Sequence, residues 1–410
     1  MPARVPRDAP IDPSPLPARP PAPTRPSAPT LPAPPTRPAP SARPAPSARA
    51  RRVPPVLARV ERNGVIESVH RGHVVQVDIN GSPVRQAGDP DVLVTLRSAI
   101  KPFSLAALVD AGGVEAFALS STELALMTGS HSGEDLHVRT LQAIFRRSGL
   151  AQSLLGCGSE GMPLDALTAA RLARDGERPG PLRHMCSGQH ASFLLLAKLA
   201  GWSPAEYWRP DHPVTGAMRA IVSRVFGVAP DRLVIAIDGC GIDTYAVPLG
   251  SIARAYAFLA DPGAVGRHDP RSGLVPAMIT IRDAMLAHPE MVGGTRDRLD
   301  TALMKALPGR VVSKAGGEAL RGMGLVPGPR LTGPATGIAT KIEDGDGRER
   351  ATRAVAVEAL RQAGLIDAPT LRALARYHRP SERDPHGRLT AETIADFELA
   401  PVGELVGRGE

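Results

Sequence analysis

Aromatic residues and lysine are scarce in this 410-residue chain, and long apolar runs are missing. Aromatic residues make up 3% of the sequence, too few for the base-stacking surfaces of nucleic-acid binders. No run of roughly 18 apolar residues occurs, so we expect no membrane-spanning helix. The chain starts without the apolar stretch of a secretory signal, and its three cysteines are too few for a disulfide framework. These absences predict a soluble cytoplasmic protein.

Proline and positive charge are concentrated at the N-terminus. Of the 43 prolines, 18 lie in residues 1–50, and residues 1–52 hold nine arginines against two aspartates. This segment carries +7 of the formal net charge of +8, so the rest of the chain is nearly neutral. Without hydrophobic periodicity, residues 1–53 are expected to be disordered with polyproline character. The sequence therefore argues against a nucleic-acid partner, except through this basic tail.

The remaining chain divides into an expected catalytic domain, 54–378, and a polar C-terminal tail, 379–410. Short β-rich runs at 56–96 and glycine-rich alternating runs at 311–347 flank a region with helical periodicity. Strands at both ends with helices between them predict an α+β fold, in which an antiparallel sheet lies beside a helical region. Helices are expected at 133–148, 164–174, 190–200, 213–226, 249–260, 274–287, 295–307 and 349–363, and a further strand at 232–238.

Lysine is the first pointer to chemistry, because only five of the 49 basic residues are lysine. Arginine stays protonated, whereas a desolvated lysine can become a neutral base. Lys101 follows Ser98 by three residues, a spacing at which a helical turn brings amine and hydroxyl together. Lys314 precedes Ala-Gly-Gly on an expected strand, where small residues let a ligand approach. Lys198 and Lys305 are expected on solvated helix surfaces.

Three further loops carry polar or sulfur side chains. Residues 130–134 read Ser-His-Ser-Gly-Glu before an expected helix, and Ser132 is a candidate either for its N-cap or for a site. Cys186 stands in Cys-Ser-Gly-Gln-His, and Cys240 follows an expected strand in Asp-Gly-Cys-Gly. These thiols, with His190, could hold a zinc ion, or they could be buried and unpaired.

Taken together and in this order, the motifs resemble the thermolabile, rhizobial-type L-asparaginase II family. The resemblance covers roughly residues 56–365 and implies a fold similar to serine β-lactamases and penicillin-binding proteins, usually in a homodimer. It implies hydrolysis of L-asparagine to L-aspartate and ammonia. The motifs are Arg97-Ser98-x-x-Lys101-Pro-Phe, Ser130-His131-Ser-Gly-Glu134, Cys186-Ser-Gly-x-His190, Asp238-Gly-Cys240-Gly, Ser313-Lys314-Ala-Gly and Lys341-Ile-Glu-Asp-Gly-Asp346.

By motif position, the resemblance implies two serine–lysine pairs in one active site, Ser98 with Lys101 and Ser130 with Lys314. A desolvated lysine near another lysine has a lowered pKa and can accept a serine proton. We expect Ser98 to form the acyl-enzyme with Lys101 as its base, while Ser130 and Lys314 relay protons to the leaving ammonia. The reversed assignment, with Ser130 as nucleophile, stays open.

Charged and polar neighbours of these pairs are expected to bind the substrate. Arg97 is placed to hold the α-carboxylate by a bidentate pair. Asp238 or Glu134 is expected to hold the α-ammonium group. His131 and His190 complete the set of expected substrate-binding residues.

The resemblance also implies a zinc ion, held by two cysteines and by the lysine of a Cys-Ser-Gly-Lys-His motif. The two cysteines correspond to Cys186 and Cys240, but Gln189 stands at the lysine position in this chain. A neutral carboxamide is a poorer zinc ligand than a deprotonated amine. We therefore expect zinc to be bound weakly or not at all, and we expect no organic cofactor.

Two other functions remain open on the sequence. A penicillin-recognising serine hydrolase shares the Ser-x-x-Lys arrangement of Ser98 and Lys101. An inactive asparagine-binding homologue is the second, with Gln189 as the first sign of lost activity.

Overall fold

The computed structural model describes residues 53–160, 162–329 and 331–402. The chain divides into two units, Met1–Arg52 and Val53–Glu410. The first unit, where the disordered segment was predicted, lies outside the described residues. In the described part of the second unit, none of the helices combines the length and the apolar character that crossing a bilayer requires.

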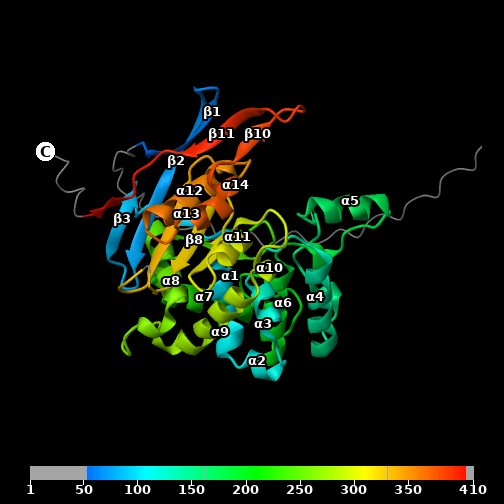
Figure 1. Ribbon diagram of the computed structural model, residues 1–410. Coiled ribbons are helices and arrows are strands. Elements are labelled where there is room, and N and C mark those ends of the chain that lie inside the picture. The colour runs from blue at the N-terminus through cyan, green and yellow to red at the C-terminus, as the bar shows by residue number, and fades with distance from the viewer. Residues whose placement is uncertain (1–52, 161, 330, 403–410) are drawn as a thin grey trace, which may run out of the picture. The chain divides into compact units, whose positions relative to one another are not determined.

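An antiparallel sheet runs through the second unit (Figure 1). Its strands are β1 (Val56–Arg62), β2 (Val65–Asp78), β3 (Pro83–Ala87), β7 (Val311–Ala315), β8 (Leu320–Leu325), β9 (Thr336–Ile342), β10 (Ser381–Arg383), β11 (Leu389–Ala395) and β12 (Ala400–Pro401). The main path follows the order β10–β11–β1–β2–β9–β8–β7, while β3 pairs with β2 and with β12. Strands from both ends of the chain therefore meet in one sheet, as the sequence predicted.

A second, three-stranded antiparallel sheet and the helices make up the rest of the unit. The small sheet has the order β4 (Leu93–Thr95), β6 (Asp243–Pro248), β5 (Val234–Ile237). The helices are α1 (Lys101–Asp110), α2 (Gly113–Ala116), α3 (Ser121–Met127), α4 (Asp135–Ser148), α5 (Ala166–Arg174), α6 (Ser187–Leu199), α7 (Pro213–Phe226), α8 (Leu249–Ala260), α9 (Val275–Ala287), α10 (Pro289–Val292), α11 (Leu299–Ala306), α12 (Arg350–Gln362), α13 (Ala368–Ala373) and α14 (Ala375–His378). The predicted α+β class is confirmed.

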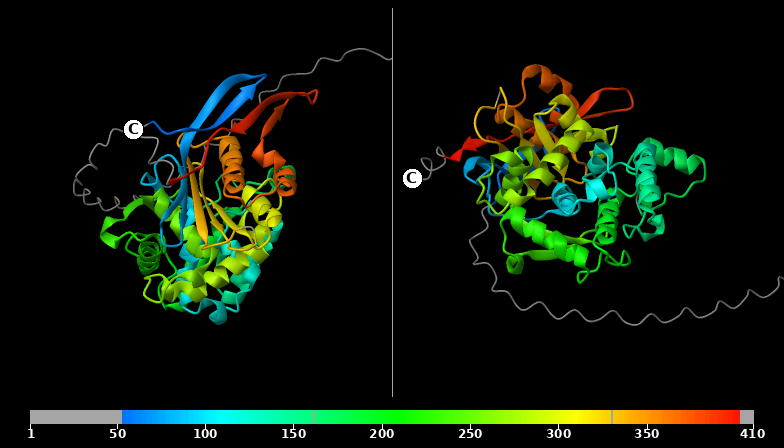
Figure 2. Two further views of the ribbon diagram at one scale, coloured as in Figure 1. Left: turned by 60° about the vertical axis from the view of Figure 1, so that its left-hand side comes forward. Right: turned by 90° about the horizontal axis from the view of Figure 1, so that it is seen from below.

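The main sheet buries both of its faces against helices. Successive residues of a strand point to opposite faces, and here they enter two separate apolar cores. Val74 and Ile338 belong to the core under α11 and α12, whereas their neighbours Val75 and Ala339 belong to the core under α8 and α1. The sheet therefore stands between two helical layers, which the two views of Figure 2 show from the side and from below.

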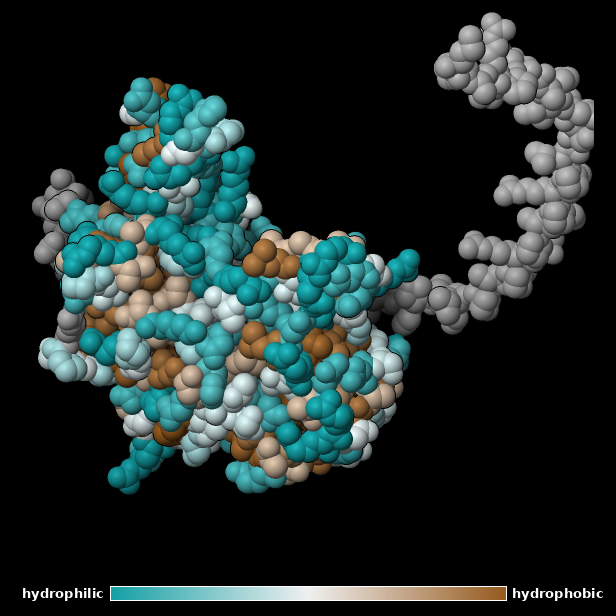
Figure 3. All heavy atoms as spheres, turned by 45° about the vertical axis from the view of Figure 1, so that its right-hand side comes forward, coloured by the Kyte–Doolittle hydropathy of each residue, from teal (hydrophilic) through white to brown (hydrophobic). Residues whose placement is uncertain are grey.

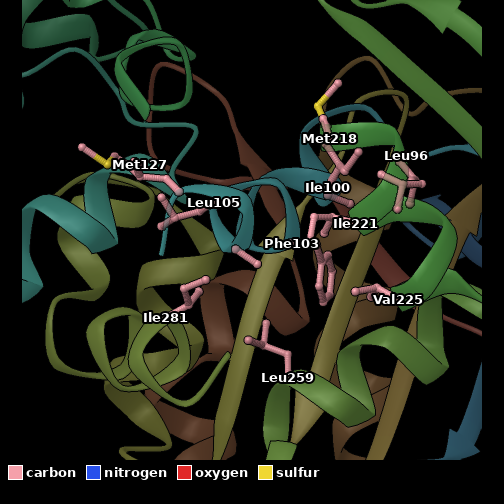
Figure 4. Close-up of a cluster of buried hydrophobic side chains, with 14 of the residues drawn as sticks. Leu96, Ile100, Phe103, Leu105, Met127, Met218, Ile221, Val225, Leu259 and Ile281 are labelled. Carbon is pink, nitrogen blue, oxygen red and sulfur yellow. The ribbon is translucent and has the colours of Figure 1, made fainter. Parts of the chain in front are cut away.

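Helix α1 is anchored by the larger of these cores (Figure 4). Phe103 is fully buried, and its ring meets those of Phe226 and Tyr256 edge-on, with centroids 5.2 Å apart in each case. Burying an aromatic side chain of this kind stabilises a fold by about 1.5–3 kcal/mol. Because Lys101 is the first residue of α1, this packing fixes the position of that lysine.

Helix α8 lies very close to the sheet, and glycine in β9 makes the approach possible. A Cβ atom on Gly337 would stand 1.9 Å from the carbonyl oxygen of Ala253 in α8. Any larger residue at this position must push the helix away from the strand, which disturbs the packing of the core behind it.

Replacing Gly337 with alanine is therefore expected to lower the free energy of unfolding by about 3 kcal/mol. Urea denaturation of the purified variant measures this change. Gly180→Ala is the matched control, because a Cβ atom there meets nothing within 4 Å. Equal stability of the two variants would contradict the close packing of α8.

Two local predictions have different outcomes. Ser120 followed three residues later by Glu123 predicts a capping box at a helix start. It is confirmed at the start of α3, where the Ser120 side chain accepts from the Glu123 amide. The expected loose tail after residue 378 is wrong, because β11 pairs with β1 and β10 pairs with β11. The alternating pattern in residues 389–395 is too short to predict a strand from the sequence. The strand is stabilised by pairing with β1, which is distant in the chain.

On the face shown in Figure 3, polar residues dominate the projecting end of the sheet, and apolar residues are scattered over the rest.

Candidate active site

Ser130 lies in the loop between α3 and α4, and backbone contacts hold it in place. The Ser130 amide donates to the carbonyl oxygen of Val292 at 2.9 Å, and the carbonyl oxygen of Ser130 accepts from Arg298 Nη2 at 2.8 Å. The side chain is only 5% exposed. The backbone of Ser130 is therefore fixed, and its hydroxyl has little contact with bulk water.

Two buried lysines reach this hydroxyl from different parts of the chain. Lys101 Nζ lies 3.2 Å from Ser130 Oγ and donates to the carbonyl oxygen of Gly129 at 2.8 Å. Lys314 Nζ, from β7, lies 2.8 Å from Ser130 Oγ and 2.6 Å from the carbonyl oxygen of Ala315. Both lysine side chains are at most 1% exposed. The structure thus brings three of the four expected catalytic residues into direct contact.

Burial lowers the pKa of Lys314 to about 7, because the charged ammonium form loses its hydration. The carboxylate of Asp300 opposes this change, whereas the positive charges of Lys101, Arg298 and Arg321 add to it. A large fraction of Lys314 is therefore a neutral amine near neutral pH, and a neutral amine can accept a proton from a hydroxyl.

Asp300 is a residue that sequence reasoning missed. It is fully enclosed, accepts from Ser313 Oγ at 2.7 Å and from the Ala315 amide at 3.0 Å, and pairs with Arg321. It therefore fixes the strand on both sides of Lys314. The sequence did not point to Asp300, because it lies in the helix predicted at 295–307, and a charged residue in an amphipathic helix normally faces solvent.

Ser98 lines the same site but stands apart from the two lysines. It lies in a 3-10 turn, Arg97–Ile100, that leads into α1. Lys101 Nζ is directed to Gly129, Ser130, Met185 and Cys186, and within the described residues it forms no hydrogen bond with Ser98. The three-residue spacing therefore places Ser98 and Lys101 at one helical turn, but their side chains are not hydrogen-bonded to each other in this structure.

Arg97 and Asp238 form an ion pair at the wall of the site. Arg97 Nε donates to Asp238 Oδ2 at 3.0 Å, and the Arg97 side chain is 31% exposed. Burial lowers the pKa of Arg97, but the hydrogen bond and charge of Asp238 and the charge of Glu318 raise it above its ordinary value. The terminal nitrogens of this guanidinium remain available to an anionic ligand.

Two thiols lie behind the lysines. Lys101 Nζ is 3.2 Å from Cys186 Sγ. A hydrogen bond from Cys240, together with the charge of Lys101, holds the pKa of Cys186 well below its usual value, against the effect of burial. The same contact raises the pKa of Cys240, and burial adds to the rise. Cys186 is therefore the more acidic of the two thiols.

Gln189, which was expected at the zinc site, has another partner in this structure. Structural zinc sites use four thiolate, imidazole or carboxylate ligands. The Gln189 side chain instead donates to Ser104 Oγ at 3.1 Å. Over residues 53–160, 162–329 and 331–402, no group of three or more His, Cys, Asp or Glu side chains is suited to a metal.

Three of the expected substrate-binding residues are not presented to a ligand. His131 and His190 are fully buried, with His131 Nε2 2.9 Å from Ser187 Oγ and His190 Nδ1 2.5 Å from the Tyr207 hydroxyl. Burial also lowers the pKa of both imidazoles, so they are neutral. Both histidines are therefore enclosed by the protein, and neither is among the residues that line the cavity.

Glu134 is the third of these residues, and its carboxylate is already occupied. It accepts from Ser132 Oγ at 2.6 Å and from Thr295 Oγ1 at 2.5 Å, and it pairs with Arg296 at 3.1 Å. Glu134, rather than Ser132, is the N-cap residue of α4. The Ser132 hydroxyl instead orients Glu134.

These side chains open on a cavity of about 830 Å³. Ser130 is at its wall, and seven other segments of the chain supply the rest. Its lining includes the polar residues Arg97, Ser98, Ser130, Asp238, Arg296, Arg298, Glu318, Asp346, Glu349 and Arg353. The arrangement supplies a hydroxyl, a buried base and charged groups for a small polar ligand.

Comparison with known proteins gives a family match over most of the chain. Residues 58–394 match the L-asparaginase II family. No curated protein matches the sequence.

Among solved structures, one titled "Crystal Structure Analysis of Mglu in its native form" is similar with 17% identity and a TM-score of 0.35, over 73% of this chain and 66% of that chain. A probable glutaminase from Bacillus subtilis, complexed with 6-diazo-5-oxo-L-norleucine, is similar with 13% identity and a TM-score of 0.35, over 72% of this chain and 84% of that chain. The chain thus spans about two thirds of the length of the Mglu structure.

Proposed function

Because the chain belongs to the L-asparaginase II family, we propose that it hydrolyses the side-chain amide of L-asparagine to L-aspartate and ammonia. The observation that supports this proposal is the Ser130 hydroxyl, which lies within hydrogen-bond distance of Lys101 and Lys314. A hydroxyl activated by a neighbouring base is the group that acyl transfer from an amide needs.

We assign the attack to Ser130 and the role of base to Lys314. The neutral amine of Lys314 accepts the Ser130 proton as Oγ attacks the amide carbon. The ammonium of Lys314 then protonates the amide nitrogen, the C–N bond breaks, and ammonia leaves an ester on Ser130. Water then gives a proton to Lys314 as its oxygen attacks the ester carbon. Lys314 returns this proton to Ser130 Oγ as the ester C–O bond breaks, which releases L-aspartate and restores the Ser130 hydroxyl.

Lys101 and Arg97 have different tasks in this scheme. Lys101 donates to Ser130 Oγ, so it stabilises negative charge on that oxygen as its proton leaves. Arg97 offers its free terminal nitrogens to the α-carboxylate of the substrate. The pair that Arg97 forms with Asp238 fixes the direction of its guanidinium.

Ser98, which the sequence favoured as nucleophile, lines the same cavity. In our proposal it contacts the bound amide and does not form the ester. The reason is that its hydroxyl forms no hydrogen bond with a lysine in the described part of the chain, whereas the Ser130 hydroxyl forms two.

Ammonia release from L-asparagine by the purified chain tests the proposed function. We expect steady release of ammonia and a stoichiometric amount of L-aspartate, with L-glutamine run in parallel to measure substrate preference. Nitrocefin turnover without ammonia release would instead indicate a penicillin-recognising hydrolase. Tight binding of L-asparagine without turnover would indicate an inactive homologue.

Weak zinc binding is a further part of the proposal, since the carboxamide of Gln189 stands where the family has a lysine. We expect the purified chain to contain much less than one zinc per chain, and chelation to change its activity by less than about twofold. Gln189→Lys restores the family ligand and is expected to increase zinc content, measured by elemental analysis. Full zinc occupancy in the unchanged chain would contradict this proposal.

The expected homodimer, cytoplasmic location and lack of a nucleic-acid partner stay predictions. Sedimentation measures the first. Deletion of residues 1–53 is expected to leave catalysis unchanged and to remove any salt-sensitive association of the basic segment.

A further inference from the structure

The carboxylates that the sequence offered for the substrate α-ammonium group are already occupied. Asp238 pairs with Arg97, and Glu134 is saturated by two hydroxyls, a backbone amide and Arg296. A carboxylate whose charge is already balanced by a guanidinium attracts a second cation less strongly than an unpaired carboxylate does. The acidic groups along the cavity therefore need to be compared one by one.

One of these carboxylates has no hydrogen-bond or ion-pair partner among the described residues. Among the described residues that line the cavity, Asp165 pairs with Arg296, and both Asp297 and Glu349 pair with Arg353. Asp346 is buried; its Oδ2 accepts from the Thr352 amide, and its enclosed Oδ1 has no hydrogen-bond partner among the described residues. The remaining carboxylate, Glu318, is exposed, and its side chain has no hydrogen bond or ion pair in the described part of the chain. Its charge is nevertheless close enough to influence Arg97.

Glu318 is held in an unusual backbone conformation by the turn between β7 and β8. The Leu320 amide donates to the carbonyl oxygen of Gly317, and the two central residues, Glu318 and Ala319, have φ of 53° and 55°. A turn with two positive φ angles normally carries Asn-Gly, because side chains with a Cβ atom are strained there. The local sequence therefore does not favour the turn that the structure adopts.

Neighbouring strands and loops hold this turn in position. Lys341 Nζ donates to the carbonyl oxygen of Glu318 at 2.5 Å, and the Ile342 amide donates to that of Ala319 at 3.3 Å. On the other side, a Cβ atom on Gly317 would lie 3.0 Å from Arg97 Cζ. The turn is thus packed between β9 and the guanidinium that faces the cavity. Strained backbone that is fixed from several sides is frequent at ligand sites.

From this juxtaposition of an unpaired carboxylate and a guanidinium on one cavity wall, we infer that Glu318 binds the α-ammonium group of the substrate. Arg97 and Glu318 then hold the two charges of an α-amino acid side by side, while its side-chain amide reaches Ser130. The site would select zwitterionic amino-acid amides over amides that lack the amino group. This inference rests on the proposed function.

A cycle of two substrates and two enzymes tests the contact. The substrates are L-asparagine and succinamate, which has the same amide and carboxylate without the amino group. Glu318→Gln is expected to lower kcat/KM for L-asparagine by about 10- to 100-fold, mostly through KM, because a hydrogen bond to a charged group is lost. It is expected to change kcat/KM for succinamate by less than about threefold.

Two further variants separate binding from folding. Glu349→Gln removes a carboxylate of the same cavity that is already paired, and it is expected to leave the preference for L-asparagine unchanged. Glu318→Gly relieves the strained turn, so it is expected to keep or raise the melting temperature and still lose the preference. An equal loss on both substrates, or an unchanged preference in Glu318→Gln, would overturn the inference.

The outcome also distinguishes this inference from the proposed function. If the unchanged chain releases no ammonia from either substrate, the proposed function fails, and calorimetric titration of the same two ligands into the same variants replaces the kinetics. Tighter binding of L-asparagine than of succinamate, lost in Glu318→Gln, then supports the Glu318 contact alone. Equal binding of both ligands contradicts it.

Discussion

Replacing Ser130 with alanine is expected to lower kcat for L-asparagine by about 10⁴-fold or more, with the fold intact. The reason is that Ser130 Oγ is the hydroxyl that both lysines contact, at 3.2 Å and 2.8 Å. A methyl group at this position fits the space and leaves no nucleophile. Ammonia release measures kcat, and circular dichroism with thermal denaturation measures the fold.

Two serine variants serve as controls for Ser130→Ala. Ser192→Ala removes a buried hydroxyl that donates to the carbonyl oxygen of Gln189 inside α6, and it is expected to retain activity. Ser98→Ala is expected to lose less than about 100-fold, because in our scheme Ser98 only contacts the substrate. Full loss in Ser98→Ala with substantial activity in Ser130→Ala would mean that the two serines have the opposite roles.

Replacing Lys314 with methionine is expected to lower kcat by about 10³- to 10⁴-fold, since the general base is removed while the apolar stem is kept. Lys305→Met is the matched control, because Lys305 is an exposed lysine that pairs with Glu290. It is expected to change activity by less than about twofold. Comparable losses in the two variants would show that Lys314 acts through general charge rather than as a base.

The pH dependence of the unchanged enzyme follows from the same lysine. Burial lowers the pKa of Lys314 to about 7, and only its neutral form accepts the Ser130 proton. The value of kcat/KM is therefore expected to fall about tenfold per pH unit below pH 7 and to level off above it. Lys314→Met should lose this dependence. A profile that is flat between pH 5 and pH 8 would contradict a base with this pKa.

Local features of the fold could be predicted from the sequence. The capping box at Ser120, the helix that ends at Gly149, and the strands around the two glycine-rich runs each depend on residues within one or two turns. The strands after residue 380 could not be predicted in this way, because β11 joins the sheet by pairing with β1, more than 300 residues earlier in the chain. Short strands gain stability from partners that the local sequence does not contain.

The site was predictable only in part, and for a similar reason. Scarcity of lysine singled out Lys101 and Lys314, but Ser130 and Lys314 are 184 residues apart, and only the resemblance to a family joined them. Asp300 and Glu318 gave no signal at all. Asp300 stands in an ordinary amphipathic helix, and the strain at Glu318 is a property of backbone angles that a sequence does not display.

The roles of Ser98 and Ser130 show the limit of residue spacing as evidence. A spacing of three residues places Ser98 and Lys101 on one turn, yet the Lys101 amine is drawn to Gly129, Ser130, Met185 and Cys186. Lysine has a long side chain, so tertiary contacts decide where its amine lies.

The most direct test of the central claim is covalent labelling with a diazoketone analogue of L-asparagine, followed by peptide mass spectrometry. Our account predicts one label per chain on Ser130, prevented by L-asparagine and lost in Ser130→Ala. It also predicts that labelling slows as the pH falls below 7, when Lys314 becomes protonated. A label on Ser98, or no label in a chain that releases ammonia, would contradict it.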